Sequence, residues 1–427
     1  MPYDFRRLIG SARRQAAIIV AMAIILFQAV PAMSAPAEIE VDGLLLPADT
    51  KVEAGSASPF AGAWVGRWDG VLKTILVVES IDAEGVASVI YSVAANPQRG
   101  FDRAWFRLAG RVEGSRMLVE GRGFSLALKF SKTGRLRAVF GDGYSFAILA
   151  KRDLKEMIQP GAEIDWSPGT SLGLATCLTE DNEPVELETV LYKPAGPGPH
   201  PLAIVNHGST GLGNDPELFG QTWSHDWLAD VLNERGYLVA FPQRRGRGRS
   251  GGLYAEGLEA DRTKGYSCDP ERALAGADRA IEDLDAAIAA LRRRDDITAG
   301  PVLMAGVSRG GMLAAVHAGH HPAEVSGVIN FVGGWIGELC ETSETINQNL
   351  VRRASAFQRP MLWLYGEDDP YYSIDHTRAM HAEFTEAGGS ADYHAIEVRG
   401  SGNGHWVAAI PPLWMDLVEA YLDSLSD

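Results

Sequence analysis

Beyond residue 200, short apolar runs of strand length alternate with longer stretches of helical pattern, and few folds accommodate this alternation. The apolar runs are Leu202–Asn206, Tyr237–Phe241, Val302–Gly306, Val325–Phe331, Met361–Tyr365 and Tyr393–Val398. The helical stretches are His225–Arg235, Arg272–Arg293, Gly311–His317, His376–Ala387 and Pro412–Ser424. This order predicts an α/β fold, with a mostly parallel sheet and helices on both faces. In such sheets the chemistry lies on loops at the carboxyl ends of the strands.

The preceding part of the chain has a different periodicity. Apolar and polar residues alternate in short pieces, which are Lys73–Glu79, Ala87–Val93, Ala104–Leu108, Arg116–Glu120, Leu126–Phe130, Leu136–Phe140 and Tyr144–Leu149. Many short strands separated by turn residues predict a small antiparallel barrel or sandwich. Trp64 and Trp68, four residues apart, would share one face of a strand, and we interpret them as core. Nothing in this segment has the spacing of a catalytic or metal-binding motif.

These patterns divide the chain into four parts. Residues 1–35 carry the features of a secretory signal peptide: Arg6, Arg7, Arg13 and Arg14 precede the apolar run Ala16–Val30, and small residues follow. We expect an all-β domain over 38–158, a linker rich in proline and glycine over 159–172, and the α/β domain over 173–427. The protein is then exported to the periplasm or the medium. An uncleaved membrane anchor is the alternative, and the export route, general or twin-arginine, stays open.

Composition excludes several classes of function. The formal net charge of −16 argues against nucleic-acid binding, which needs clustered lysine and arginine. The three cysteines are too few for a disulfide scaffold, and without C-x-x-C spacing they do not indicate a zinc site. Hydrophobic residues at 46% and charged residues at 22% are ordinary for a globular protein.

The segment Gly306-Val307-Ser308-Arg309-Gly310 follows a predicted strand and opens a predicted helix. This is the context in which G-x-S-x-G forms a sharp turn that holds a nucleophilic serine clear of the sheet. A second match, around Ser250, lies several polar residues beyond its strand and precedes no helical pattern. We therefore predict Ser308 as the nucleophile and interpret residues 248–252 as an arginine-rich loop.

A serine nucleophile needs a base and an acid that orients it, in the chain order serine, acid, histidine. The acid candidates lie in Glu367-Asp368-Asp369-Pro370, just after a strand. We choose Asp369 for its spacing from the glycine and for the following proline, and Asp368 stays the alternative. His405, flanked by small residues beyond the last strand, is the predicted base. The remaining histidines of this region fall within helix or strand patterns and are interpreted as structural: His376, His381 and His394.

The tetrahedral intermediate needs backbone N–H donors. We expect one from Arg309, the residue after the nucleophile. The other would come from the loop after Leu202–Asn206, where Ser209 is the first choice and Gly208 the second. His207 in the same loop is interpreted as structural.

The exported destination and the positions of the cysteines suggest one disulfide. Cys268 and Cys340 each lie in a segment beyond the carboxyl end of a core strand, on the same side of the predicted sheet. We predict that they are bonded and that Cys177 is free.

These motifs resemble those of the α/β-hydrolase superfamily, and within it the dienelactone hydrolase and prolyl-oligopeptidase-like branch. The resemblance covers about residues 173–427 and rests on Asn-His-Gly-Ser at 206–209, the segment 245–252, the turn around Ser308, Tyr-Gly-Glu-Asp-Asp-Pro at 365–370 and Gly-Asn-Gly-His at 402–405. It implies a serine hydrolase that forms an acyl-enzyme and needs no cofactor or metal. Dienelactone hydrolases proper carry a cysteine nucleophile, where this chain has Ser308.

We therefore expect a serine hydrolase acting on small, soluble carboxylic esters. A peptidase of the prolyl-oligopeptidase type is the second interpretation, although no propeller-blade repeat of about 40–50 residues is visible. A catalytically silent binding protein on the same fold is the third. Gly251–Asp269 and Gly333–Arg353 are candidate cap segments. The loop after Tyr237–Phe241 carries four arginines, Arg244, Arg245, Arg247 and Arg249. They are candidates for binding an anionic substrate, and the alternative is that their charges are solvated or ion-paired. Residue patterns do not indicate the oligomeric state.

Overall fold

The computed structural model describes residues 37–53, 58–97, 100, 102–141, 143, 145–166, 168–398 and 402–425. The expected signal peptide, residues 1–35, lies outside the described residues. Two compact units divide the chain between Trp166 and Ser167. No helix among the described residues is long and apolar enough to cross a membrane.

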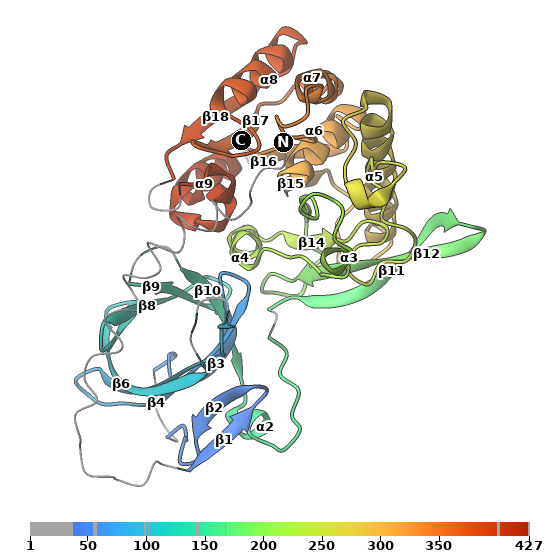
Figure 1. Cartoon of the computed structure of the whole chain (residues 1–427). Coiled ribbons are helices and arrows are strands. Elements are labelled where there is room, and N and C mark those ends of the chain that lie inside the picture. Colours follow the sequence, from blue (N-terminus) through green and yellow to red (C-terminus); the bar gives the residue numbers. More distant parts are fainter. Residues whose placement is uncertain are drawn as a thin grey trace. The chain divides into compact units, whose positions relative to one another are not determined.

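The first unit is built around a closed antiparallel barrel, seen as a ring of strands in Figure 1. The strand order around the barrel is β10-β3-β4-β5-β6-β7-β8-β9. The bounds are β3 Gly62–Trp68, β4 Leu72–Ile81, β5 Val86–Val93, β6 Ala104–Glu113, β7 Arg116–Gly121, β8 Phe124–Phe130, β9 Leu136–Phe140 and β10 Phe146–Arg152. The predicted small antiparallel domain is thus a barrel.

Alternation along each strand separates two apolar clusters in this unit. Trp64 and Trp68 are packed with Leu76 and Leu126 in the larger cluster, as their spacing predicted. Neighbouring residues on β3 and β4 face the other way and join the smaller cluster. That cluster also includes a hairpin that the sequence patterns did not reveal, β1 Glu38–Val41 with β2 Leu44–Pro47, and the short helix α2 Leu154–Met157.

The expected linker over 159–172 is shorter in the structure. Trp166 is buried in the smaller cluster, and its indole N–H donates a hydrogen bond to the Asp42 carboxylate. At the other end, Thr170 already belongs to the first strand of the second unit. Burial of Trp166 and its hydrogen bond to Asp42 therefore hold most of this proline- and glycine-rich segment against the first unit.

The second unit contains an eight-stranded mixed sheet with the order β11-β12-β14-β13-β15-β16-β17-β18. The bounds are β11 Thr170–Glu180, β12 Glu183–Tyr192, β13 Leu202–Asn206, β14 Leu238–Pro242, β15 Val302–Val307, β16 Val325–Phe331, β17 Met361–Gly366 and β18 Ala391–Ile396. From β14 to β18 the strands are parallel, and the hairpin β11–β12 is antiparallel at one edge. The predicted α/β sheet is therefore present, with an antiparallel edge.

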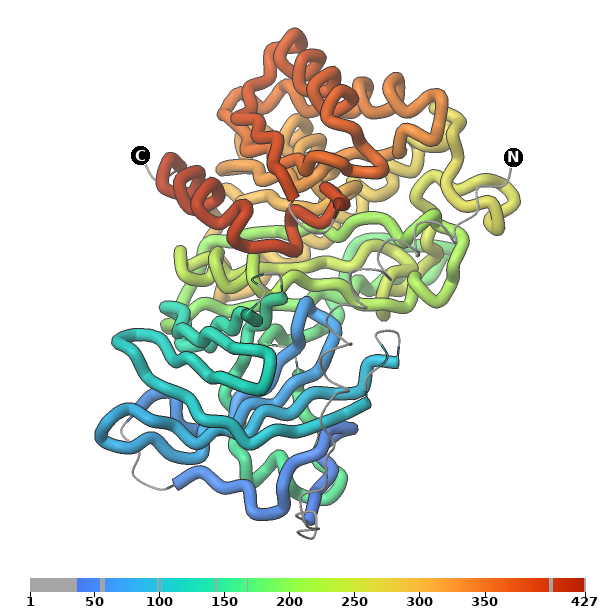
Figure 2. Tube along the Cα trace, turned by 60° about the vertical axis from the view of Figure 1, so that its left-hand side comes forward, coloured from blue at the N-terminus to red at the C-terminus, as the bar shows by residue number. Residues whose placement is uncertain are grey.

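Helices cover both faces of this sheet. Their bounds are α3 Pro216–Phe219, α4 Asp226–Glu234, α5 Pro270–Leu291, α6 Arg309–His320, α7 Ser343–Ala354, α8 Ile374–Glu386 and α9 Met415–Ser424, with short 3₁₀ turns η2 Arg262–Lys264, η3 Gly404–Ala409 and η4 Pro411–Leu413. On β16, Asn330 lies against Gly311 of α6, whereas the next residue, Phe331, packs on Trp414 just before α9. Because adjacent strand residues face opposite sides, α6 and α9 lie on opposite faces. Figure 2 follows this unit from green to red.

One expected cap segment belongs to the helix layer instead. Within Gly333–Arg353, the structure forms α7, which packs between α6 and α8. Its buried residues Ile346, Leu350 and Ala354 recur at helical spacing and face the core. The polar residue Asn347 is also buried, and its side chain hydrogen-bonds the backbone of Trp335 and Ile336, so it ties the segment into the helix layer.

Candidate active site

Ser308 occupies the sharp turn between β15 and α6. Its φ of 57° lies in the left-handed region, which non-glycine residues rarely adopt. The backbone N–H of Ser308 donates to the carbonyl of Phe331 at 2.9 Å, and its carbonyl accepts from Gly311 at 2.9 Å. These bonds hold the strained residue in place, and its side chain is largely buried.

Close backbone approaches explain the glycines around Ser308. A Cβ on Gly306 would lie 2.1 Å from the carbonyl oxygen of Gly310, and a Cβ on Gly310 would lie 2.1 Å from that of Asn206. Neither neighbour is a flexible side chain, so any substitution there would displace the turn. The G-x-S-x-G signature therefore reflects three backbone segments packed against one another.

Asp369 and His405 are brought together from separate loops. The Nδ1 of His405 lies 2.8 Å from Oδ2 of Asp369. The other carboxylate oxygen of Asp369 accepts hydrogen bonds from the backbone N–H groups of Tyr371 at 2.8 Å and Tyr372 at 3.2 Å. The carboxylate is therefore fixed on both sides, and its side chain is almost fully buried.

The two loops meet through glycines. A Cβ on Gly366, the last residue of β17, would lie 2.1 Å from the carbonyl oxygen of Gly404. Asn403 caps the following turn η3, where its Oδ1 accepts from the N–H of His405 at 3.0 Å. The alternative acid, Asp368, is exposed and has a φ of 58°, and the His405 ring is paired with Asp369 instead.

Tyr372 connects this pair with the serine. Its ring centroid lies 5.9 Å from that of His405. Burial raises the pKa of the Tyr372 phenol, while a hydrogen bond with Ser308 acts in the opposite direction. The Tyr372 ring thus lies beside His405, and among the described residues no direct hydrogen bond joins His405 to Ser308.

The loop that carries the predicted donors Ser209 and Gly208 approaches Ser308 at Gly208. A Cβ on Gly208 would be 3.2 Å from Cβ of Ser308, so the loop after β13 passes directly over the serine. The N–H groups of Arg309 and Ser209 have no hydrogen-bond acceptor within the described part of the chain. The N–H of Thr210, in contrast, already donates to the phenol oxygen of Tyr266 at 3.0 Å.

His207 has a structural role in this loop. Its Nε2 accepts from the backbone N–H of Arg244 at 3.2 Å, so the proton of the neutral ring is on Nδ1, which lies 2.9 Å from the carbonyl oxygen of Gly208. Burial lowers the pKa of His207 well below its usual value, and the nearby charges of Arg244 and Arg247 act in the same direction. The neutral ring therefore braces the loop.

The side chain of Arg309 is clamped below the turn, a feature that sequence patterns did not reveal. Its guanidinium carbon lies 3.5 Å from the ring centroid of Tyr266 and 4.2 Å from that of Trp335. Its Nη1 donates to the carbonyl of Glu256 at 2.8 Å. A cation held between two aromatic faces and a carbonyl is firmly positioned, which anchors the first residue of α6 through its side chain.

The second G-x-S-x-G match is a structural turn. The hydroxyl of Ser250 donates to the carbonyl of Gln243 at 2.7 Å and accepts from the N–H of Glu188 at 2.8 Å. The first bond closes the loop after β14 on itself, and the second ties that loop to strand β12. The Ser250 hydroxyl is therefore engaged in two hydrogen bonds with backbone groups, which is a structural role.

Three of the four loop arginines are ion-paired within the fold. Their partners are Glu256 for Arg244, Asp283 and Glu282 for Arg245, and Glu188 for Arg249. Arg247 is buried, donates to the carbonyl of Leu218 at 2.8 Å and has no carboxylate partner among the described residues. The pairing shows that most of this charge stabilises the loop.

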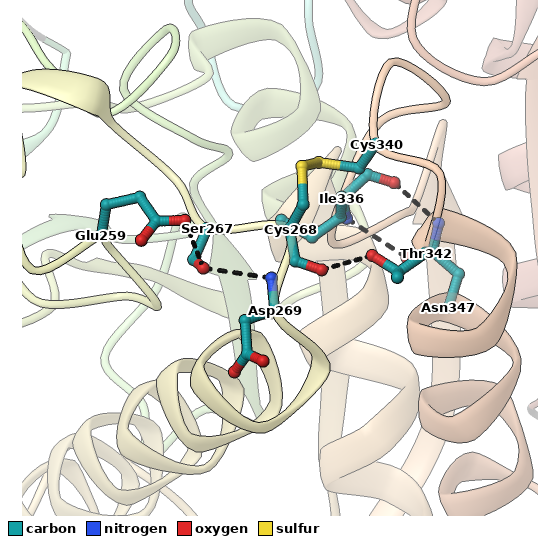
Figure 3. Close-up of a disulfide and its surroundings, with 8 residues drawn as sticks. All are labelled: Glu259, Ser267, Cys268, Asp269, Ile336, Cys340, Thr342 and Asn347. Atoms are coloured by element: carbon teal, nitrogen blue, oxygen red, sulfur yellow. Dashed lines mark hydrogen bonds between the residues drawn. A yellow bond between two sulfur atoms is a disulfide. The ribbon is translucent and has the colours of Figure 1, made fainter.

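The predicted disulfide between Cys268 and Cys340 is present (Figure 3). Tyr266 and Trp335, the two faces of the clamp, lie two and five residues before the bonded cysteines. The hydroxyl of Thr342 donates to the carbonyl of Cys268 across the same junction. Cys177 is free and exposed.

Loss of this disulfide should destabilise the second unit. A Cys268→Ser/Cys340→Ser variant frees a closed loop of 72 residues in the unfolded chain, which in the entropic model costs about 4 kcal/mol of unfolding free energy. Urea unfolding of wild type and variant measures the difference, with Cys177→Ser as the control expected to match wild type. Equal midpoints for the double variant and wild type would contradict the prediction.

The comparisons with known proteins agree with the fold and motifs. Residues 187–399 match the dienelactone hydrolase family. This part of the chain belongs to that family. The dienelactone hydrolase region thus extends from β12 into the segment just before His405. Among curated proteins, none matches the chain.

Two solved structures are similar to part of this chain at low sequence identity. Est1E from Butyrivibrio proteoclasticus, solved with bound ferulic acid, shares 15% identity over 60% of this chain and 100% of its own, with a TM-score of 0.42. The Pyrococcus furiosus esterase Pf2001 shares 14% identity over 62% of this chain and 95% of its own, with a TM-score of 0.42.

Proposed function

We propose that this protein is an exported serine esterase that cleaves small, soluble carboxylic esters through Ser308, His405 and Asp369. The observation that carries the proposal is the fixed pair of Asp369 and His405, together with the strained turn that holds Ser308 between β15 and α6. Membership of the dienelactone hydrolase family supports a hydrolytic reaction.

The first half of the reaction forms an acyl-enzyme. Asp369 holds the Nδ1–H of His405, which leaves Nε2 free to take the Ser308 proton as Oγ attacks the ester carbonyl. The N–H groups of Arg309 and Ser209, or Gly208, stabilise the negative oxygen of the tetrahedral intermediate. The alcohol leaves with the proton from His405.

The second half repeats the route with water. His405 takes a proton from water, the hydroxide attacks the acyl carbon, and Ser308 leaves with its proton restored. Free N–H donors beside the serine and a base held in one tautomer are sufficient for both halves. No step calls for a cofactor or a metal.

Export is part of the proposal and rests on the pattern of residues 1–35. The bonded pair Cys268–Cys340 supports it, because disulfides persist in oxidising compartments. Fractionation of cells that express the full chain, with detection of a product shortened near residue 35, tests it. A full-length product retained in the cytoplasm would contradict export.

Esters should be cleaved much faster than matched amides. Amides are intrinsically harder to cleave, and the described site has no evident feature that captures a peptide terminus. We expect kcat/KM for short-chain p-nitrophenyl esters to exceed that for matched peptide anilides by at least about 100-fold, or about 3 kcal/mol in activation free energy. The panel should include longer acyl chains, aryl esters and sugar esters. Equal or faster cleavage of the anilides would favour the peptidase interpretation.

A further inference from the structure

A cluster of two histidines and one aspartate lies between α5 and α6, away from the proposed catalytic residues. Asp285 is on α5, and His317 and His321 are one helical turn apart at the end of α6. Their ligand atoms, one from each side chain, all lie within 4.8 Å of one another. The two helices pack against each other on the same face of the sheet, as the contacts between them show.

The distances within the cluster are short enough for the Asp285 carboxylate to interact with both imidazole rings. Oδ1 of Asp285 lies 3.1 Å from Nε2 of His317 and 3.3 Å from Nε2 of His321. This oxygen is nevertheless buried without an aligned hydrogen-bond donor among the described residues. One carboxylate oxygen thus lies within 3.3 Å of a ring nitrogen of each histidine.

The same distances fit shared coordination of one ion. Zn²⁺ binds imidazole nitrogen and carboxylate oxygen at about 2.0–2.2 Å, usually with tetrahedral geometry. The edge of such a tetrahedron is about 3.3–3.5 Å long, as follows from those bond lengths. The two separations from Oδ1 are close to this edge, so the three atoms can share an ion after small side-chain movements.

We propose that Asp285, His317 and His321 form a binding site for Zn²⁺. Oδ1 of Asp285 and the two Nε2 atoms are the protein ligands, and a water molecule completes the tetrahedron. Access for the ion and the water is available because the Asp285 side chain is 42% exposed and that of His321 is 35% exposed, while His317 forms the buried base.

This site is separate from the ester-cleaving residues. His317 follows Ser308 by nine residues on one helix, a rise of roughly 13 Å at 1.5 Å per residue. An ion there would join α5 to the helix whose first turn carries the proposed nucleophile and oxyanion donor. Its expected effect is on the stability of this helix pair.

Calorimetric titration of the metal-free full chain with Zn²⁺ tests the proposal. We expect one equivalent to bind wild type and to raise the melting temperature. Asp285→Asn and His321→Ala should each weaken binding at least 10-fold and remove that rise. His320→Ala is the matched control, because His320 is exposed on the same turn and lies outside the cluster; it should bind like wild type.

Two further measurements keep the result decisive. Co²⁺ bound to wild type should give the intense visible absorption of tetrahedral cobalt, even if a cluster variant fails to fold. His405→Ala should bind Zn²⁺ like wild type, which separates this site from the proposed catalytic histidine. Absence of Zn²⁺ binding by wild type, loss of binding in His405→Ala, or full binding by Asp285→Asn and His321→Ala would each overturn the proposal.

Discussion

Ser308→Ala is expected to abolish ester hydrolysis while the protein stays folded. Loss of the nucleophile removes the acyl-enzyme route, and such changes typically lower kcat about 10⁴-fold or more. Alanine keeps a Cβ at the same backbone position, and the hydrogen bonds that hold the turn use the Ser308 backbone. Turnover of a p-nitrophenyl ester, labelling by a fluorophosphonate and circular dichroism together measure the outcome.

Ser250→Ala is the matched control for this prediction. It removes the serine of the other G-x-S-x-G match, whose hydroxyl makes two hydrogen bonds with backbone groups. We expect turnover and labelling close to wild type and a loss of about 1–2 kcal/mol in unfolding free energy. If Ser250→Ala is inactive and Ser308→Ala retains activity, the assignment of Ser308 as the nucleophile is wrong. If folded wild type is neither labelled nor active, the silent binding protein becomes the better interpretation.

The main features of the fold could be predicted because they depend on short-range patterns. Apolar runs such as Leu202–Asn206 and Val302–Val307 are strands buried on both faces, and their composition is distinctive. The edge hairpin β11–β12 was not among the predicted strands. Its strand β11 is largely exposed and rich in polar residues, so its sequence resembles a loop.

The candidate site was predictable only in part, for a related reason. Ser308 and His405 each lie in a short glycine-rich motif that can be recognised from the sequence alone. The clamp of Tyr266 and Trp335 around Arg309 joins residues far apart in the chain, and nothing near each aromatic residue indicates it. The same holds for Tyr372, which was not among the candidates. His317 and His321 were not among the sequence candidates, and their meeting with Asp285 depends on how α5 packs on α6.

Asp369→Asn is expected to lower kcat about 10³- to 10⁴-fold with little change in the fold. Asparagine keeps an oxygen that can accept from the N–H groups of Tyr371 and Tyr372, so the loop after β17 should stay in place. Its amide N–H₂ then faces Nδ1 of His405 and donates to it. The imidazole must then carry its proton on Nε2, and a protonated Nε2 can no longer accept the Ser308 proton.

Asp368→Asn is the control, because Asp368 is exposed and asparagine tolerates its left-handed backbone. Turnover of the same ester and fluorophosphonate labelling should fall together in Asp369→Asn and stay near wild type in Asp368→Asn. The reverse pattern would assign the acid to Asp368.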